Sequence, residues 1–163
     1  GTITTRDGCR DLSRDPENCG TAGTRCANAE YCIGGVCVCR PGLTLEGTQC
    51  VDLNTDPSHC GAVGTACSPC SGGACVSTCP GDTRDCRGAC VDDQSDPLNC
   101  GGCGDICRTD EVCVEGECDS FTPQGLCTMC PCPLDCSSHE QCCAYPGAPT
   151  DAICVHDHGG ACP

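Results

Sequence analysis

The feature that most constrains this chain is a cysteine-rich segment that occurs three times. CRDLSRDPENCG begins at Cys9, CVDLNTDPSHCG at Cys50 and CVDDQSDPLNCG at Cys90. The copies follow one another at intervals of 41 and 40 residues. A fixed period of this length indicates tandem modules, each too small to form a separate hydrophobic core.

The second copy departs from the cysteine spacing of the other two. After Cys67, the fourth cysteine of the pattern is expected at position 73, where the chain has Gly73. Cys70 replaces it, and Cys75 is back in register.

Composition indicates that disulfides stabilise these modules. Leu, Ile, Val and Phe make up about an eighth of the chain and the net charge is -15, a combination typical of disordered proteins. However, 27 of the 163 residues are cysteine, far above the threshold for a disulfide scaffold. We therefore predict a small disulfide-rich fold of tandem irregular modules, elongated and with little hydrophobic core.

Local signals predict single helical turns and short strands inside each module. Asp15, Asp56 and Asp96 each precede a proline, an arrangement typical of a helix N-cap followed by the first helical position. Apolar alternation predicts brief strands at 36–38 and 112–114. We divide the chain into an N-terminal extension (1–8), repeat 1 (9–39), linker and repeat 2 (40–79), linker and repeat 3 (80–118), and a C-terminal cysteine module (119–163).

Two additional cysteines distinguish the third copy and the linker before it. Cys86 aligns with Glu46 of the preceding linker, and Cys103 aligns with Val63 of the second repeat. Because the linker and its module gained a cysteine together, we predict a Cys86–Cys103 disulfide. We expect the remaining cysteines to pair mostly within modules.

Residues 79–118, which contain CRGACVDDQSDPLNCGGCGDIC, resemble the cysteine repeat of the stigma-specific protein family. Residues 9–37 and 50–75 match its pattern partially, since they lack the second cysteine of the Asn-Cys-Gly-x-Cys-Gly run. Related repeats are similar to segments of secreted bacterial proteins. The resemblance implies a secreted, noncatalytic, disulfide-rich module.

The C-terminal module has a different cysteine order and resembles knottin-like miniproteins. That resemblance rests on six cysteines with an adjacent pair in the middle: Cys132, Cys136, Cys142, Cys143, Cys154 and Cys162. Because the total of 27 is odd, one cysteine is left over. Counting assigns it to Cys127 or Cys130, the other of which would close the third repeat.

This cysteine content predicts an oxidising location: secreted, extracellular or on the cell surface. A start at Gly1, without an initiator Met, fits a chain whose signal peptide has been removed. With 23 acidic residues, eight arginines and no lysine, the chain should repel nucleic acid. No apolar run is long enough for a membrane span.

Candidate chemistry is sparse. His156 and His158 form a weak metal-ligand pair, and the cysteines from Cys127 to Cys136 only approach iron–sulfur spacing. No nucleophile, base and orienting group can be assembled, so we expect no enzyme activity and no cofactor.

The resulting hypothesis is a secreted structural or cell-surface protein. Its partner could be a second copy of the chain, in a filament assembled through the β-prone Thr2, Ile3, Thr4 and Thr5. One alternative is an extracellular binding module, an adhesin or inhibitor, that contacts another protein through loops 43–47 or 145–151. A second alternative is a metal-binding or redox protein.

Overall fold

The computed structural model describes residues 2–5, 8–13, 15–123, 130, 136–145 and 148–163. Regular structure within these residues consists of short β-strands joined by turns, without a helix. The strands are β1 (Thr2–Thr5), β2 (Gly8–Asp11), β3 (Glu30–Ile33), β4 (Val36–Cys39), β5 (Thr44–Glu46), β6 (Gln49–Val51), β7 (Cys70–Ser71), β8 (Ala74–Cys75), β9 (Arg84–Cys86), β10 (Ala89–Val91), β11 (Glu111–Val114), β12 (Glu117–Ser120), β13 (Thr122–Pro123), β14 (Glu140–Tyr145) and β15 (Ala148–His156).

Most of these strands form two-stranded antiparallel hairpins. They are β1–β2, β3–β4, β5–β6 and β11–β12. The expected strands at 36–38 and 112–114 lie in β4 and β11. One larger sheet has the order β8-β7-β10-β9, in which β7 of the second repeat pairs in parallel with β10 of the following linker. The linker before the third repeat thus adds two strands to the sheet of the second repeat.

The three repeats share one framework of backbone hydrogen bonds. The glycine that follows the second cysteine donates its N–H to a carbonyl eight residues earlier, over 2.7–2.8 Å. The third cysteine donates its N–H to the carbonyl of the proline in the Asp-Pro pair, over 2.6–2.9 Å. The glycine donors are Gly20, Gly61 and Gly101, and the cysteine donors are Cys26, Cys67 and Cys107.

The predicted position of the shifted cysteine in the second repeat needs correction. Gly73 donates to the carbonyl of Asn54 as Gly35 donates to Ser13, so Gly73 is equivalent to Gly35 and not to a cysteine. Cys70 pairs with Cys60 as Cys32 pairs with Cys19 in the first repeat. The second repeat therefore lacks three residues before Cys70, and the fourth cysteine keeps its place in the fold.

The Asp-Pro segments form single turns that are not helical. In the third repeat, the Asn99 N–H donates to the Asp96 carbonyl at 3.0 Å, and one Asp96 carboxylate oxygen accepts the Leu98 N–H at 2.8 Å. The same two bonds recur at Asp15 and Asp56. The predicted capping role of the aspartate holds, but the chain leaves the helical conformation after one hydrogen bond, because the N–H of the next residue, Cys100, donates to the Asp105 carbonyl.

Cysteines form the interior of each repeat. The three clusters are Cys19, Cys26 and Cys32; Cys60, Cys67 and Cys70; and Cys100, Cys107 and Cys113. A fourth cluster contains Val112 and Val114 of β11 with Cys143, Ile153 and Val155 of β14 and β15. This aliphatic core joins the third repeat to the C-terminal sheet, whose order is β13-β15-β14.

Three disulfides between described residues stabilise the C-terminal module: Cys130–Cys142, Cys136–Cys154 and Cys143–Cys162. In chain order these six cysteines pair first to third, second to fifth and fourth to sixth. Cys130 thus belongs to this module, in addition to the residues named for the knottin-like set. Cys132 lies outside the described residues.

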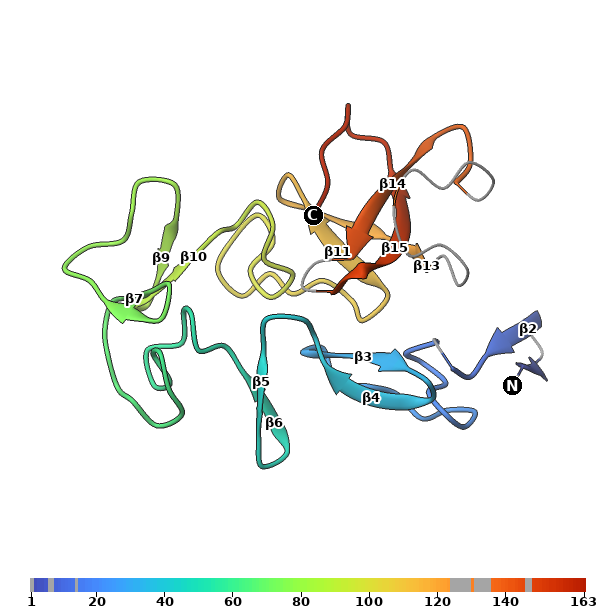
Figure 1. The fold of residues 1–163 in the computed structure, drawn as a ribbon, viewed down its shortest axis with the longest axis horizontal. Coiled ribbons are helices and arrows are strands. Elements are labelled where there is room, and N and C mark those ends of the chain that lie inside the picture. Colours follow the sequence, from blue (N-terminus) through green and yellow to red (C-terminus); the bar gives the residue numbers. More distant parts are fainter. Residues whose placement is uncertain (1, 6–7, 14, 124–129, 131–135, 146–147) are drawn as a thin grey trace.

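The chain doubles back, so the modules do not form the rod of purely neighbouring contacts that the repeats suggest. Tyr31, on β3 of the first repeat, packs against the aliphatic core of the third repeat and C-terminal sheet. In Figure 1 the second repeat lies where the chain turns back, and β11 and β15 lie above the β3–β4 hairpin of the first repeat. The accessible surface is 8967 Å², above the roughly 7,600 Å² expected for a compact domain of this mass, so the arrangement remains open.

Candidate functional site

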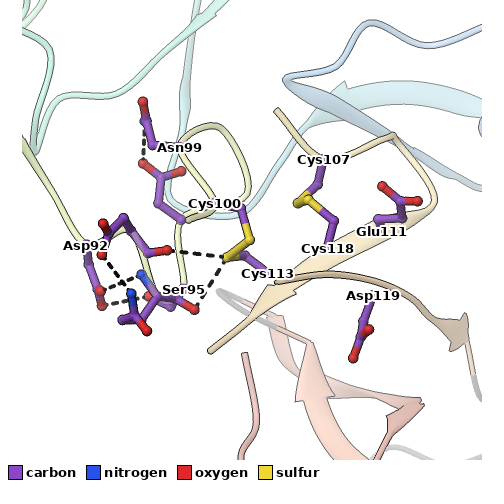
Figure 2. Close-up of a disulfide and its surroundings, with 12 residues drawn as sticks. Asp92, Ser95, Asn99, Cys100, Cys107, Glu111, Cys113, Cys118 and Asp119 are labelled. Carbon is purple, nitrogen blue, oxygen red and sulfur yellow. Dashed lines mark hydrogen bonds between the residues drawn. A yellow bond between two sulfur atoms is a disulfide. The ribbon is translucent and has the colours of Figure 1, made fainter. Parts of the chain in front are cut away.

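Paired disulfides occupy the places where cysteines gather most closely. In the third repeat, Cys100–Cys113 and Cys107–Cys118 lie side by side on the β11–β12 hairpin (Figure 2). The Sγ atoms of Cys100, Cys107 and Cys118 lie within 4.8 Å of one another. An equivalent group in the first repeat contains Cys19, Cys26 and Cys37. All of these sulfurs are in disulfides, so they offer no thiolate to a metal.

The additional cysteines of the third copy form one bridge. Cys86 and Cys103 are disulfide-bonded, with their Cα atoms 5.4 Å apart. In the second copy, Glu46 aligns with Cys86, and its carboxylate lies 3.3 Å from Nδ1 of His59. The same Nδ1 accepts the Gly64 N–H at 3.2 Å. The linker before the third repeat is therefore tied covalently to that repeat, whereas in the second copy the aligned Glu46 lies beside His59 without a covalent bond.

Ten of the twelve disulfides between described residues lie within the assigned segments, and two cross their boundaries. The crossing bridges are Cys39–Cys50 and Cys79–Cys90, each of which closes a linker hairpin. Consecutive segments are thus covalently joined at both boundaries between repeats.

The assignment of the odd cysteine to Cys130 is wrong. Cys130 bonds to Cys142, so it neither remains free nor closes the third repeat. The cysteines of the third repeat pair among themselves and with the preceding linker. Cys127, the other candidate, lies outside the described residues.

A buried arginine joins the first linker to the third repeat. Arg40 is only 3% exposed, and its Nη1 and Nη2 atoms donate to the carbonyls of Glu111 and Arg108 at 3.0 and 2.7 Å. Its Nε donates to the Asn28 carbonyl of the first repeat at 2.7 Å. No sequence motif signals this contact, because its acceptors are main-chain oxygens about 70 positions away.

Arg40 also lines a cleft together with Pro41, Leu43 and Pro97. Its lining includes Asp52 and Asn54 from the start of the second repeat and Asp96 from the turn of the third. Burial, with further contributions from the charges of Asp52 and Asp92, raises the pKa of Asp96. The Asp96 oxygens already accept bonds from the Leu98 N–H and the Asn99 side chain, within the same turn.

The histidine pair lies at the end of β15. His158 Nε2 is 2.5 Å from Oδ2 of Asp119, on β12. The rings of His156 and His158 meet edge to face, with their centroids 5.4 Å apart. The structure therefore brings the two predicted metal-ligand candidates together and adds a carboxylate that sequence reasoning missed.

The candidate assembly segment is paired within its own chain. Residues Thr2–Thr5 form β1, which is antiparallel to β2, with Thr4 opposite Cys9. The structure contains one chain, and the role of this hairpin in assembly is a proposal treated below.

These features define a class: a small disulfide-rich protein whose tandem modules are stapled to one another and have no helix among the described residues. The model of the Stigma-specific STIG1-like protein family matches residues 68–122, about a third of the chain and essentially the third repeat with its linker. No curated protein and no solved structure gives a significant match. In the part of the chain that the structure describes, no helix is long and apolar enough to cross a membrane.

Proposed function

We propose that this chain is a secreted structural or cell-surface protein with no catalytic activity. The observation that carries the proposal is that all three repeats share one disulfide and hydrogen-bond framework, while disulfides also cross both boundaries between repeats. Such a construction resists local unfolding, because the disulfides within and between the repeats restrict the conformations that an opened module can adopt. Disulfides of this number persist in oxidising compartments, which supports the extracellular location.

Proteolysis tests the proposed resistance of the disulfide-linked modules to local unfolding. The oxidised protein should survive prolonged trypsin treatment, although it contains eight arginines. After reduction and alkylation, the same protein should be cleaved within minutes. Rapid cleavage between modules while the disulfides are intact would contradict the proposal.

Self-assembly through the N-terminal hairpin is the finer form of the proposal. In the two-stranded β1–β2 sheet, each strand pairs only with the other among the described residues, so each has a free edge that a second copy could extend. Deleting residues 1–8 should reduce particle size in concentrated solution, measured by light scattering. Unchanged size in the truncated protein would remove the hairpin from any assembly contact.

A binding role is the second candidate, because an apolar side chain is exposed on a disulfide-closed loop. Leu45, in β5, is 62% exposed inside the ring closed by Cys39–Cys50. Disulfide-closed loops lose little conformational entropy on binding, so they suit adhesins and inhibitors. A protein that stays monomeric at high concentration, and binds an extracellular partner in a Leu45-dependent way, would favour this function.

A further inference from the structure

The two histidines near the C-terminus have a geometry that the structural role does not require. His156 ends β15, and His158 follows two residues later. Glu140, the partner of His156 in the β14–β15 ladder, lies opposite it. The Glu140 carboxylate accepts the Ser137 N–H at 2.9 Å, so the two imidazoles are the candidate ligands at this end of the sheet.

The ring separation fits a shared metal ion. Two imidazoles that bind one tetrahedral zinc ion, through nitrogens about 2.0–2.1 Å from the metal, have ring centres about 5 Å apart. The centroids of His156 and His158 are 5.4 Å apart and their planes are nearly perpendicular, at 83°.

Asp119 supplies the carboxylate contact that accompanies metal-binding histidines. Its Oδ2 is 2.5 Å from Nε2 of His158, and both side chains are about four-fifths buried. A histidine that donates one ring N–H to a carboxylate presents its other nitrogen as a more basic ligand in a fixed orientation. The contact thus leaves Nδ1 of His158 to bind a cation.

We propose that His156 and His158 bind a first-row transition-metal dication, with Asp119 as the positioning residue. Imidazole nitrogens favour zinc, copper and nickel over calcium or magnesium. The protein's net charge of -15 attracts cations to its surface. The site goes beyond the structural role and is independent of it.

Zinc titration by calorimetry tests this site, with Co²⁺ absorption as a second probe. The folded, oxidised protein is first treated with an alkylating agent to block any free thiol. It should bind one zinc ion, and His156→Ala or His158→Ala should weaken the affinity at least tenfold. Asp119→Asn should weaken it by a smaller factor, since it removes only the orienting carboxylate.

His59→Ala is the matched control, because this histidine lies in the second repeat beside Glu46. It should leave zinc affinity unchanged. Circular dichroism confirms that each variant retains the fold. The proposal is overturned if the protein binds no zinc, or if folded His156→Ala and His158→Ala variants bind it as tightly as the parent.

Discussion

At the residue scale, the repeats depend on a close backbone contact between two glycines. A Cβ built on Gly101 would lie 2.6 Å from the carbonyl oxygen of Gly116, and corresponding contacts of 2.4 Å occur at Gly20 and Gly61. Gly101 also has φ of 76°, in the left-handed region. Only glycine satisfies both conditions, which explains the invariant glycine after the second cysteine of each copy.

Gly101→Ala should therefore destabilise the third repeat by about 2–4 kcal/mol, through backbone strain together with the steric clash. Hydrogen exchange of the amides around residues 93–116 would measure the loss. Gly104→Ala is the control, because Gly104 has φ of 77° but no atom within 4 Å of its built Cβ. If Gly101→Ala and Gly104→Ala lower the stability equally, the steric contact with the Gly116 carbonyl adds nothing to the backbone strain.

Arg40 is the residue on which the contact between the first linker and third repeat most depends. Arg40→Met keeps most of the side-chain volume but removes every guanidinium donor to the carbonyls of Asn28, Arg108 and Glu111. We expect a loss of about 3–5 kcal/mol, because buried carbonyls lose charged hydrogen bonds. Guanidinium denaturation with intact disulfides would measure it.

Arg25→Met is the matched control for Arg40→Met. Arg25 has a 72% exposed side chain that pairs with Glu17 on the surface, so its replacement should change stability by less than about 1 kcal/mol. If Arg40→Met and Arg25→Met lower the stability by similar amounts, the hydrogen bonds from Arg40 to the third repeat do not stabilise the fold.

The raised pKa of Asp96 predicts how the stability of the protein depends on pH. Burial raises the pKa of this carboxyl, so the folded state binds its proton more tightly than the unfolded state. The resulting stabilisation is complete below the unfolded value of 3.8 and is lost as pH rises through the higher folded pKa. Relative to Asp96→Asn, the parent protein should therefore gain stability as pH falls from 7 to below 4.

Denaturant midpoints measured for both proteins across this pH range check the prediction. Asp56→Asn, in the equivalent turn of the second repeat, controls for changes to the cap itself. A parent protein that loses stability relative to Asp96→Asn on acidification would contradict the assigned direction.

At the scale of elements, the Cys86–Cys103 bridge ties a linker to its module. The second copy lacks this bridge and retains the same backbone hydrogen bonds, so the bridge adds stability without determining the fold. Replacing both cysteines by alanine should lower stability by about 3 kcal/mol and preserve the circular dichroism spectrum. Loss of the native spectrum would show that this bridge is needed for folding.

The elements also show where sequence reasoning succeeds. Comparison of the copies predicts the Cys86–Cys103 pair and the capping aspartates, because both are local and repeated. It misplaces Gly73, since spacing alone cannot distinguish a moved cysteine from a three-residue deletion. It also misassigns Cys130, because pairing in the C-terminal module depends on how β14 and β15 meet.

At the scale of the whole molecule, the repeats predict an extended series of modules and the structure doubles back. The contacts that produce the return are Arg40 with main-chain carbonyls and Tyr31 with the aliphatic core. Main-chain acceptors exist at every residue, so no pattern in the sequence identifies those that Arg40 reaches. The His158–Asp119 contact is equally hidden, because it joins residues 39 positions apart.

The central claim is that the three repeats share one disulfide pattern and that disulfides join consecutive repeats. Non-reducing peptide mapping by mass spectrometry tests it most directly. The account predicts equivalent pairs in the three repeats (Cys19–Cys32, Cys60–Cys70 and Cys100–Cys113) together with the boundary bridges Cys39–Cys50 and Cys79–Cys90. Pairs that differ from repeat to repeat, or free thiols at the boundary cysteines, would contradict it.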